Sequence, residues 1–146
     1  MLVPGGTLLA VQQLTPTYAT AIGLLLWAAR VVTTEDTLGM VSDRTKFETR
    51  FLDWVRVKGR AGATRIYELL GPKSDHWLSD EAARIYDEGL AAYRERDWDV
   101  AERRFDEFLA LHPEDGPTAV MRERVQMLRA HPPGAEWDGV FEQLSK

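Results

Sequence analysis

The sequence predicts an α+β protein, in which a short β-rich region precedes an α-helical tail. Residues 47–58 and 64–70 are rich in β-branched and aromatic side chains and flank a turn with two glycines, a pattern typical of an antiparallel hairpin. From Leu78 onward, apolar residues recur at helical spacing. The cluster Pro72-Lys73-Ser74-Asp75 is the expected boundary between the two regions.

Composition limits the chain to one domain or two very small ones. It has 146 residues, of which 45% are hydrophobic and none is Cys, so a core can form but disulfides, thiolate metal sites and a Cys nucleophile are excluded. The absence of Cys fits a reducing compartment, and we expect a cytoplasmic location.

The net charge of -5 is unevenly distributed along the chain. Residues 1–71 carry eight Lys and Arg against six Asp and Glu, whereas residues 72–146 carry ten against seventeen. Because an acidic tail repels a polyanion, nucleic acid is not an expected partner.

Residues 1–29 are interpreted as a divergent N-terminal segment, either helical or disordered. The apolar stretch from Tyr18 to Val32 reads YATAIGLLLWAARVV, which is interrupted by Arg30 and shorter than the roughly 20 residues of a membrane span. No basic region precedes it, as a signal peptide would require. We expect a buried or poorly ordered helix over residues 18–29. The alternative is a membrane anchor or targeting segment.

Three strands are expected in the β-rich region. Residues 31–34 are β-branched throughout and predict a short buried strand, residues 35–41 a helical turn, and residues 42–46 a polar loop. Strict alternation along the first hairpin strand predicts one face with Leu52, Trp54, Arg56 and Lys58, and another with Phe51, Val55 and Val57.

Three helices are expected in the tail, each with one buried stripe. The stripes are Ala82, Tyr86, Gly89, Leu90 and Tyr93; then Ala101, Phe105, Phe108 and Leu109; then Met121, Val125 and Leu128. Asp99 and Glu102 have the spacing of a capping box, which predicts that the second helix begins there. Pro117 suits the first turn of the third helix. Trp137 and Phe141 are the expected packing anchors of the C-terminal segment.

The first two tail helices resemble one tetratricopeptide repeat. The matching signature positions are Gly89, Ala101, Phe105 and Pro113, whereas Ala92 and Phe108 depart from the pattern. A single repeat cannot form a stable array, because each repeat buries its apolar face on a neighbour. Two interpretations therefore remain, a protein-interaction module and a helical hairpin that packs on the rest of the chain.

A basic turn is the main candidate for a binding site. Between residues 56 and 65 the sequence has four cations and no acid, with Gly59 and Gly62 among them: Arg56, Lys58, Arg60 and Arg65. A glycine beside a lysine lets the backbone approach a ligand closely while the ammonium contacts a phosphate oxygen. The alternative is a solvated edge that protects the sheet from aggregation.

Metal-binding and catalytic residues are not predicted. His76, His112 and His131 are far apart and are expected at the surface or at helix ends. A carboxylate site would form only if the fold brought together Asp36, Asp43 and Asp53. Of these, Asp53 is expected at a strand edge.

Several motifs over roughly residues 30–146 resemble those of class III adenylate/guanylate cyclases and occur in the same order. Residues 47–71 read FETRFLDWVRVKGRAGATRIYELLG, similar to the last hairpin of that catalytic domain, where Val-Lys-Gly-Lys/Arg precedes a strand close to Val-Tyr-Glu-Leu. Residues 30–38 resemble the preceding strand and the start of the next helix. The tail, residues 78–146, resembles the C-terminal extension of bacterial members in its helix pair, its Pro-Glu-Asp-Gly-Pro stretch and its closing Pro132-Pro133 with Trp-Asp-Gly-Val.

This resemblance implies a truncated, partial ferredoxin-like cyclase domain over residues 30–71. It implies a nucleotide-binding lyase of cyclic-nucleotide biosynthesis and signal transduction, which converts ATP to cyclic AMP and pyrophosphate with two Mg or Mn ions. Lys58 would contact the triphosphate, and Arg60 would share that electrostatic environment. A choice between ATP and GTP is not implied, because the base-selecting positions of the family lie upstream.

Other functional residues of the family do not match this chain. The two metal-binding aspartates and the Asn and Arg that stabilise the transition state are absent, and Arg30 abuts the next strand too closely to take the role of that Arg. We therefore expect the fragment to be inactive alone. Since cyclase sites form at a dimer interface, a homodimer or a protein partner bound by the tail is expected.

Overall fold

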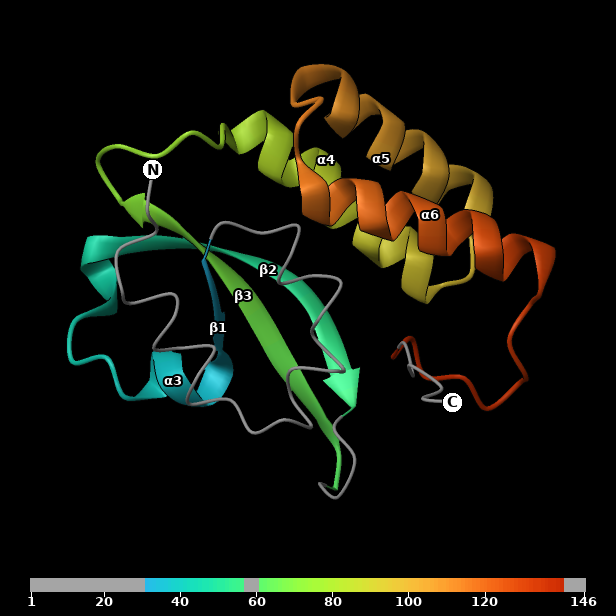
Figure 1. The fold of residues 1–146 in the computed structure, drawn as a ribbon, viewed down its shortest axis with the longest axis horizontal. Helices are drawn as coiled ribbons and strands as arrows, with labels where there is room; N and C mark the ends of the chain where they lie inside the picture. The colour runs from blue at the N-terminus through green and yellow to red at the C-terminus, as the bar shows by residue number, and fades with distance from the viewer. Residues whose placement is uncertain (1–30, 57–60, 141–146) are drawn as a thin grey trace. The chain divides into compact units, whose positions relative to one another are not determined.

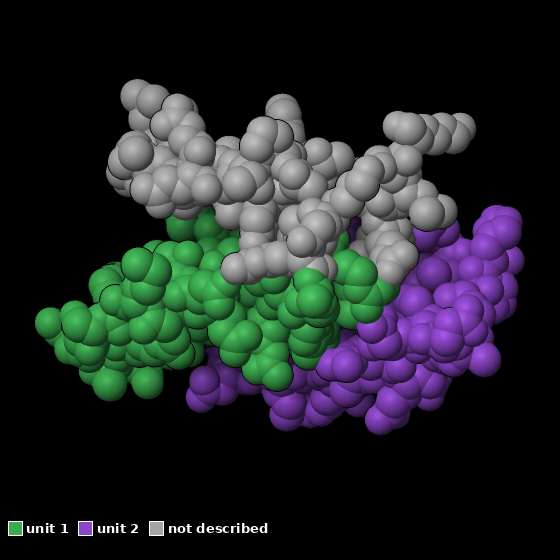
Figure 2. All heavy atoms as spheres, turned by 90° about the horizontal axis from the view of Figure 1, so that it is seen from below, with its two compact units in different colours: residues 1–77, 140–146 green, residues 78–139 purple. Residues whose placement is uncertain are grey.

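The computed structural model describes residues 31–56 and 61–140, which form a three-stranded antiparallel sheet, four α-helices and one short 3-10 helix (Figure 1). The predicted α+β class is therefore confirmed. The chain divides into two compact units, coloured separately in Figure 2. The sheet unit comprises Met1–Trp77 with Val140–Lys146, and the helical unit comprises Leu78–Gly139.

The N-terminal apolar stretch, residues 18–29, lies outside the described residues. Within the part of the chain that the structure describes, no helix combines the length and the apolar character that crossing a bilayer requires.

The sheet has the strand order β1-β3-β2, and β3 is antiparallel to both neighbours. Its strands are β1 (Val32–Thr34), β2 (Phe47–Arg56) and β3 (Ala63–Pro72). The predicted hairpin is thus confirmed. Helix α3 (Glu35–Gly39) follows β1 and is capped by Thr34. The predicted polar loop contains the 3-10 helix η1 (Arg44–Lys46).

A β-bulge in β2 overturns the predicted alternation of side chains. Phe51 pairs with Tyr67 and Asp53 pairs with the next residue along β3, Ile66. Leu52 is therefore an extra residue of β2 between two consecutive register pairs. Leu52 and Asp53 are consequently both buried. Trp54 instead lies against Phe51, with ring centroids 4.2 Å apart. The shared face predicted for Leu52 and Trp54 was wrong, and so was the edge position of Asp53, because one inserted residue reverses the direction of every later side chain.

The two faces of the sheet differ in chemistry. One, here called the ion-pair face, carries buried residues of β2 and β3: Arg50, Leu52, Asp53, Val55, Ile66 and Glu68. The other, here called the cavity face, carries Thr49, Phe51, Trp54, Tyr67 and Leu69.

A buried ion pair crosses the ion-pair face between β2 and β3. Arg50 and Glu68 are register partners, and Arg50 donates from Nε and Nη2 to Glu68 Oε2 at 3.1 and 2.5 Å. Both side chains are only 3% exposed. The Arg50 guanidinium also lies 5.2 Å from the ring centroid of Trp77. The two charges compensate each other where neither can be hydrated by bulk water.

The helical unit consists of α4 (Asp80–Arg94), α5 (Trp98–Leu111) and α6 (Gly116–Ala130). Helix α5 packs against both α4 and α6. The predicted stripes form its core, with Leu109 and Leu128 half-buried and the other members buried. Close approach of α4 to α5 depends on Gly89, because a Cβ at that position would lie 2.7 Å from Phe105 Cε1.

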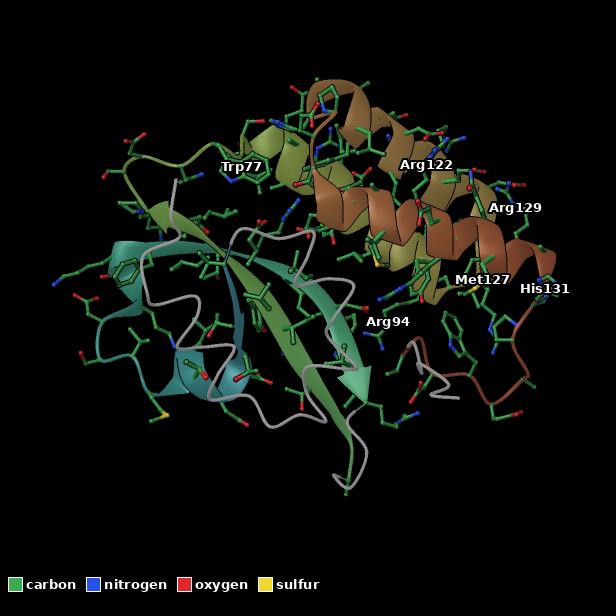
Figure 3. All side chains as sticks on the ribbon, in the orientation of Figure 1. Trp77, Arg94, Arg122, Met127, Arg129 and His131 are labelled. Atoms are coloured by element: carbon green, nitrogen blue, oxygen red, sulfur yellow. The ribbon has the colours of Figure 1, made fainter. Side chains whose placement is uncertain are left out.

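Asp97, not Asp99, caps helix α5. The Asp97 carboxylate accepts a hydrogen bond from the Val100 backbone N–H at 3.2 Å, so the predicted capping box was wrong. Asp99 and Glu102 share one side of α5 because they are three residues apart. They form ion pairs with Arg129 of α6 at 2.8 and 2.6 Å, and Arg129 is labelled in Figure 3.

Acid is expected to weaken this link between α5 and α6. The pKa of Glu102 is lowered, first by the hydrogen bond from the Gln126 amide and further by Arg129. A carboxylate whose pKa is lower in the folded state stabilises that state above its ordinary pKa, and the contribution is lost on acidification. Glu102→Gln should therefore lower stability by about 0.2–1 kcal/mol at pH 7, as for exposed ion pairs.

Thermal unfolding of the parent chain and Glu102→Gln between pH 7 and pH 3 measures this contribution. The difference in Tm should shrink as the pH falls below 4.5, the ordinary value for a glutamate. Glu123→Gln, at an exposed position of α6, is the control. A difference that stayed constant down to pH 3 would contradict the assignment.

The segment after α6 is held to the helical unit by Arg96. This residue has a positive φ of 64°, and its Nη2 donates to the carbonyl oxygens of Gly134, Ala135 and Trp137 at 2.8, 3.0 and 3.2 Å. Trp137 packs against Tyr93 with ring centroids 5.3 Å apart, as expected of a packing anchor. The other predicted anchor, Phe141, lies outside the described residues.

Candidate functional site

The predicted basic turn connects β2 to β3. Arg56 and Ala63 are the last register pair of the hairpin, so the connection comprises residues 57–62. Both predicted phosphate-binding residues, Lys58 and Arg60, belong to this connection and lie outside the described residues. Gly62 has a φ of 91°, a backbone conformation that residues with a Cβ rarely adopt.

The other two cations of the cluster flank the connection on one face of the hairpin. Arg65 pairs with Trp54 in the register and Arg56 pairs with Ala63, so Arg56 and Arg65 occupy a diagonal position across the two strands. Arg65 Nη1 lies 3.6 Å from Glu35 Oε1, and both side chains are about half exposed, at 50% and 54%. One cation of this acid-free stretch, Arg65, is therefore paired with an acidic residue of α3. Sequence spacing did not reveal this pair, because Glu35 precedes Arg65 by 30 positions.

The three aspartates considered as a carboxylate site have separate roles. Asp36 is in the first turn of α3, and Asp43 is the N-cap of η1. The Thr45 hydroxyl donates to Asp43 Oδ1 at 2.5 Å and lowers the pKa of that carboxyl. Asp53 is 1% exposed, and its Oδ1 accepts a hydrogen bond from the Trp54 backbone N–H at 2.8 Å.

Histidines are likewise dispersed. His112 and His131 occupy the C-cap positions of α5 and α6, and the His112 ring packs 5.2 Å from that of Phe108. Among residues 31–56 and 61–140, no three His, Asp or Glu side chains are grouped so that they could hold a metal ion.

An apolar cavity of about 400 Å³ opens on the cavity face of the sheet unit. It lies between the sheet and the segment from α3 to the start of β2. Its lining residues are Val31, Val32, Thr33, Glu35, Thr37, Leu38, Val41, Arg44, Phe47, Thr49, Tyr67 and Leu69. This cavity was not predicted from the sequence, because its walls come from three separate segments whose proximity follows from the pairing of β1 and β2 with β3.

Comparison with known proteins assigns no family. No protein-family model matches the chain, and neither a curated protein nor a solved structure matches it. The resemblance to class III cyclases therefore depends on the motifs of this sequence alone. It remains a prediction.

Proposed function

We propose that this chain is part of a class III nucleotidyl cyclase catalytic region and that its β2–β3 connection binds the triphosphate of ATP. One observation carries the proposal. Arg56 and Ala63 are register partners, so Val57-Lys58-Gly59-Arg60 belongs by its sequence position to the connection of an antiparallel hairpin, and this supports the proposal. This is the position that the motif occupies in the family it resembles. A partial ferredoxin-like domain and a cytoplasmic location belong to the same proposal.

Lys58 would contact the triphosphate directly. Its ammonium is a compact point charge that binds phosphate oxygens, and Arg60 would add to the positive potential of the connection. Arg56 and Arg65 flank the connection on one face and support the same potential, although Glu35 partly offsets the charge of Arg65.

The proposed role of this chain is to bind and orient the triphosphate. In the family that this chain resembles, the ribose 3′-hydroxyl attacks the α-phosphorus of ATP and pyrophosphate leaves. Two Mg or Mn ions, held by residues from outside this chain, would supply electrostatic stabilisation of the phosphates. The family's metal-binding aspartates and its Asn and Arg find no match among the residues of this chain. A dimer partner or further catalytic segments would have to supply them, so no cyclic AMP is expected from this chain alone.

Titration of the full chain with ATP, AMP and inorganic triphosphate tests the proposal. ATP and triphosphate should bind, whereas AMP should bind much more weakly because it lacks the β- and γ-phosphates. Lys58→Ala should weaken ATP binding roughly tenfold, the effect of losing one charge-assisted contact. Isothermal calorimetry at low salt measures each affinity, and added salt should weaken binding of the parent chain.

Lys73→Ala is the matched control for charge, because this exposed lysine lies just beyond β3. An equal loss of affinity in Lys73→Ala and Lys58→Ala would refute the proposed site. Formation of cyclic AMP by the purified parent chain, above the level of Lys58→Ala, would refute the expected inactivity.

A protein-interaction module without catalysis is the second candidate function. It is supported by the contact between Gly89 and Phe105, together with the buried Ala101, since these residues match three tetratricopeptide signature positions. Under this alternative, the helical unit would bind a protein partner or a second copy of the chain. The ATP titration distinguishes the two functions, because an interaction module without catalysis is not expected to bind ATP through Lys58.

A further inference from the structure

The cavity face carries an apolar surface that the rest of the described chain leaves open. Phe47 and Val41 line the cavity and are 45% and 37% exposed, and Met40 beside them is 86% exposed. Glu35 and Arg44 are the only charged residues among the described residues that line the cavity. Arg44 Nε donates a hydrogen bond to the Leu38 carbonyl oxygen at 2.7 Å. Exposed apolar surface next to an apolar cavity is typical of a docking surface.

An apolar segment of suitable length is attached directly to this cavity. Val31 and Val32 line it, and they immediately follow the apolar stretch that begins at Tyr18. Leu26 precedes Val31 by five positions, a reach of about 17 Å in extended chain and about 8 Å in helix. Both distances are short enough for the segment to contact the cavity without a long linker.

The spacing of the apolar residues in this segment suits packing on an apolar surface. Ile22, Leu25, Leu26 and Ala29 have the spacing i, i+3, i+4 and i+7, which places four apolar side chains on one stripe of a helix. A segment tethered this closely competes at an effective concentration that is millimolar for short linkers. It therefore has an advantage over a second copy of the chain or a dilute ligand.

We propose that the cavity face of the sheet unit is the docking surface of the chain's own segment Tyr18–Ala29. Leu25 and Leu26 would enter the cavity beside Leu69, and Val41 and Phe47 would close over them. The inference concerns the sheet unit alone and is independent of nucleotide binding. Substitutions in the segment should change the exposure of the cavity and leave the ATP titration unchanged.

Cross-linking tests the contact without interference, because the chain has no native Cys. Leu26→Cys is combined with Val41→Cys at the cavity rim and treated with a short flexible bis-maleimide. The control combines Leu26→Cys with Ala63→Cys, since Ala63 lies six residues along β3 from Leu69, about 20 Å away. The first pair should form the intramolecular product at least roughly fivefold faster, reflecting its higher effective concentration.

Equal rates for the two pairs would overturn the proposal. So would predominant cross-linked dimers, which would make a second copy the occupant. Mass spectrometry of the intact protein distinguishes the intramolecular product from the cross-linked dimer.

Binding of an apolar fluorescent dye to the full chain provides a second, independent measurement. Leu26→Asp should expose the cavity and raise dye binding several-fold, whereas Thr20→Asp, outside the apolar stripe, should match the parent. Strong dye binding by the parent would show an open cavity suited to a small apolar ligand and would overturn the proposal. Co-sedimentation of the parent with phosphatidylcholine vesicles, lost in Leu26→Asp, would also overturn it by making a membrane the occupant.

Discussion

Arg50→Met is expected to lower the free energy of unfolding by about 3–5 kcal/mol, the largest effect of any single substitution considered for this chain. The substitution leaves the Glu68 carboxylate only 3% exposed and without its guanidinium partner. A buried charge that has lost its partner retains the cost of dehydration without the compensating attraction. Urea denaturation at pH 7, followed by circular dichroism, measures the change.

The double variant Arg50→Met/Glu68→Leu separates the buried charge from lost packing. Because it removes both charges and retains apolar volume, it should recover most of the stability lost in Arg50→Met. Arg84→Met is the control, since the Arg84–Glu88 pair is exposed and such pairs contribute about 0.2–1 kcal/mol. A double variant no more stable than Arg50→Met would show that packing, including the contact with Trp77, causes the loss.

Gly89→Ala is expected to destabilise the chain by about 1–3 kcal/mol, as overpacking of a core does. Alanine usually stabilises a helix interior relative to glycine by about 0.5–1 kcal/mol, so the expected sign is opposite to that of helix propensity. The reason is steric, because the new Cβ would lie 2.7 and 2.9 Å from Phe105 Cε1 and Cδ1. The Phe105 ring is fully buried and has no solvent-exposed space into which it can move.

A double-mutant cycle with Phe105→Leu identifies the source of this effect. Removing the ring should relieve the contact, so Gly89→Ala should cost much less in the Phe105→Leu background than in the parent. Equal costs in both backgrounds would place the strain elsewhere in α4. A neutral or stabilising Gly89→Ala would show that α4 and α5 separate easily and would remove the main support for the tetratricopeptide-like interpretation.

Local patterns predicted the hairpin and the core stripes of the three tail helices correctly. These features depend on neighbouring residues, since a glycine-containing turn between β-rich segments and a repeat of apolar side chains are visible within about ten positions. Predictions that required a choice between neighbouring residues were less accurate. Asp97 and Asp99 both suit a helix N-terminus chemically, and only the backbone path after Arg96, with its positive φ, selects Asp97.

The candidate sites show the same division between local and long-range information. The cluster of four cations is visible in the sequence, whereas the contact of Arg65 with Glu35 depends on the pairing of β1 with β3. The cavity could not be predicted from the sequence, because its lining comes from β1 and α3, from the start of β2 and from β3.

The amino-acid sequence alone was sufficient for the α+β class, the hairpin and the helical tail, because each follows from interactions between residues close in the chain. Tertiary structure decided which side chains are buried in β2. The pairing of β2 with β3 inserts Leu52 as a bulge, and this brings Asp53 into the interior and Trp54 against Phe51. The Arg50–Glu68 ion pair likewise depends on the register of β2 with β3, because the two residues are 18 positions apart in the sequence. Such contacts depend on how whole strands align, and no local periodicity encodes that alignment.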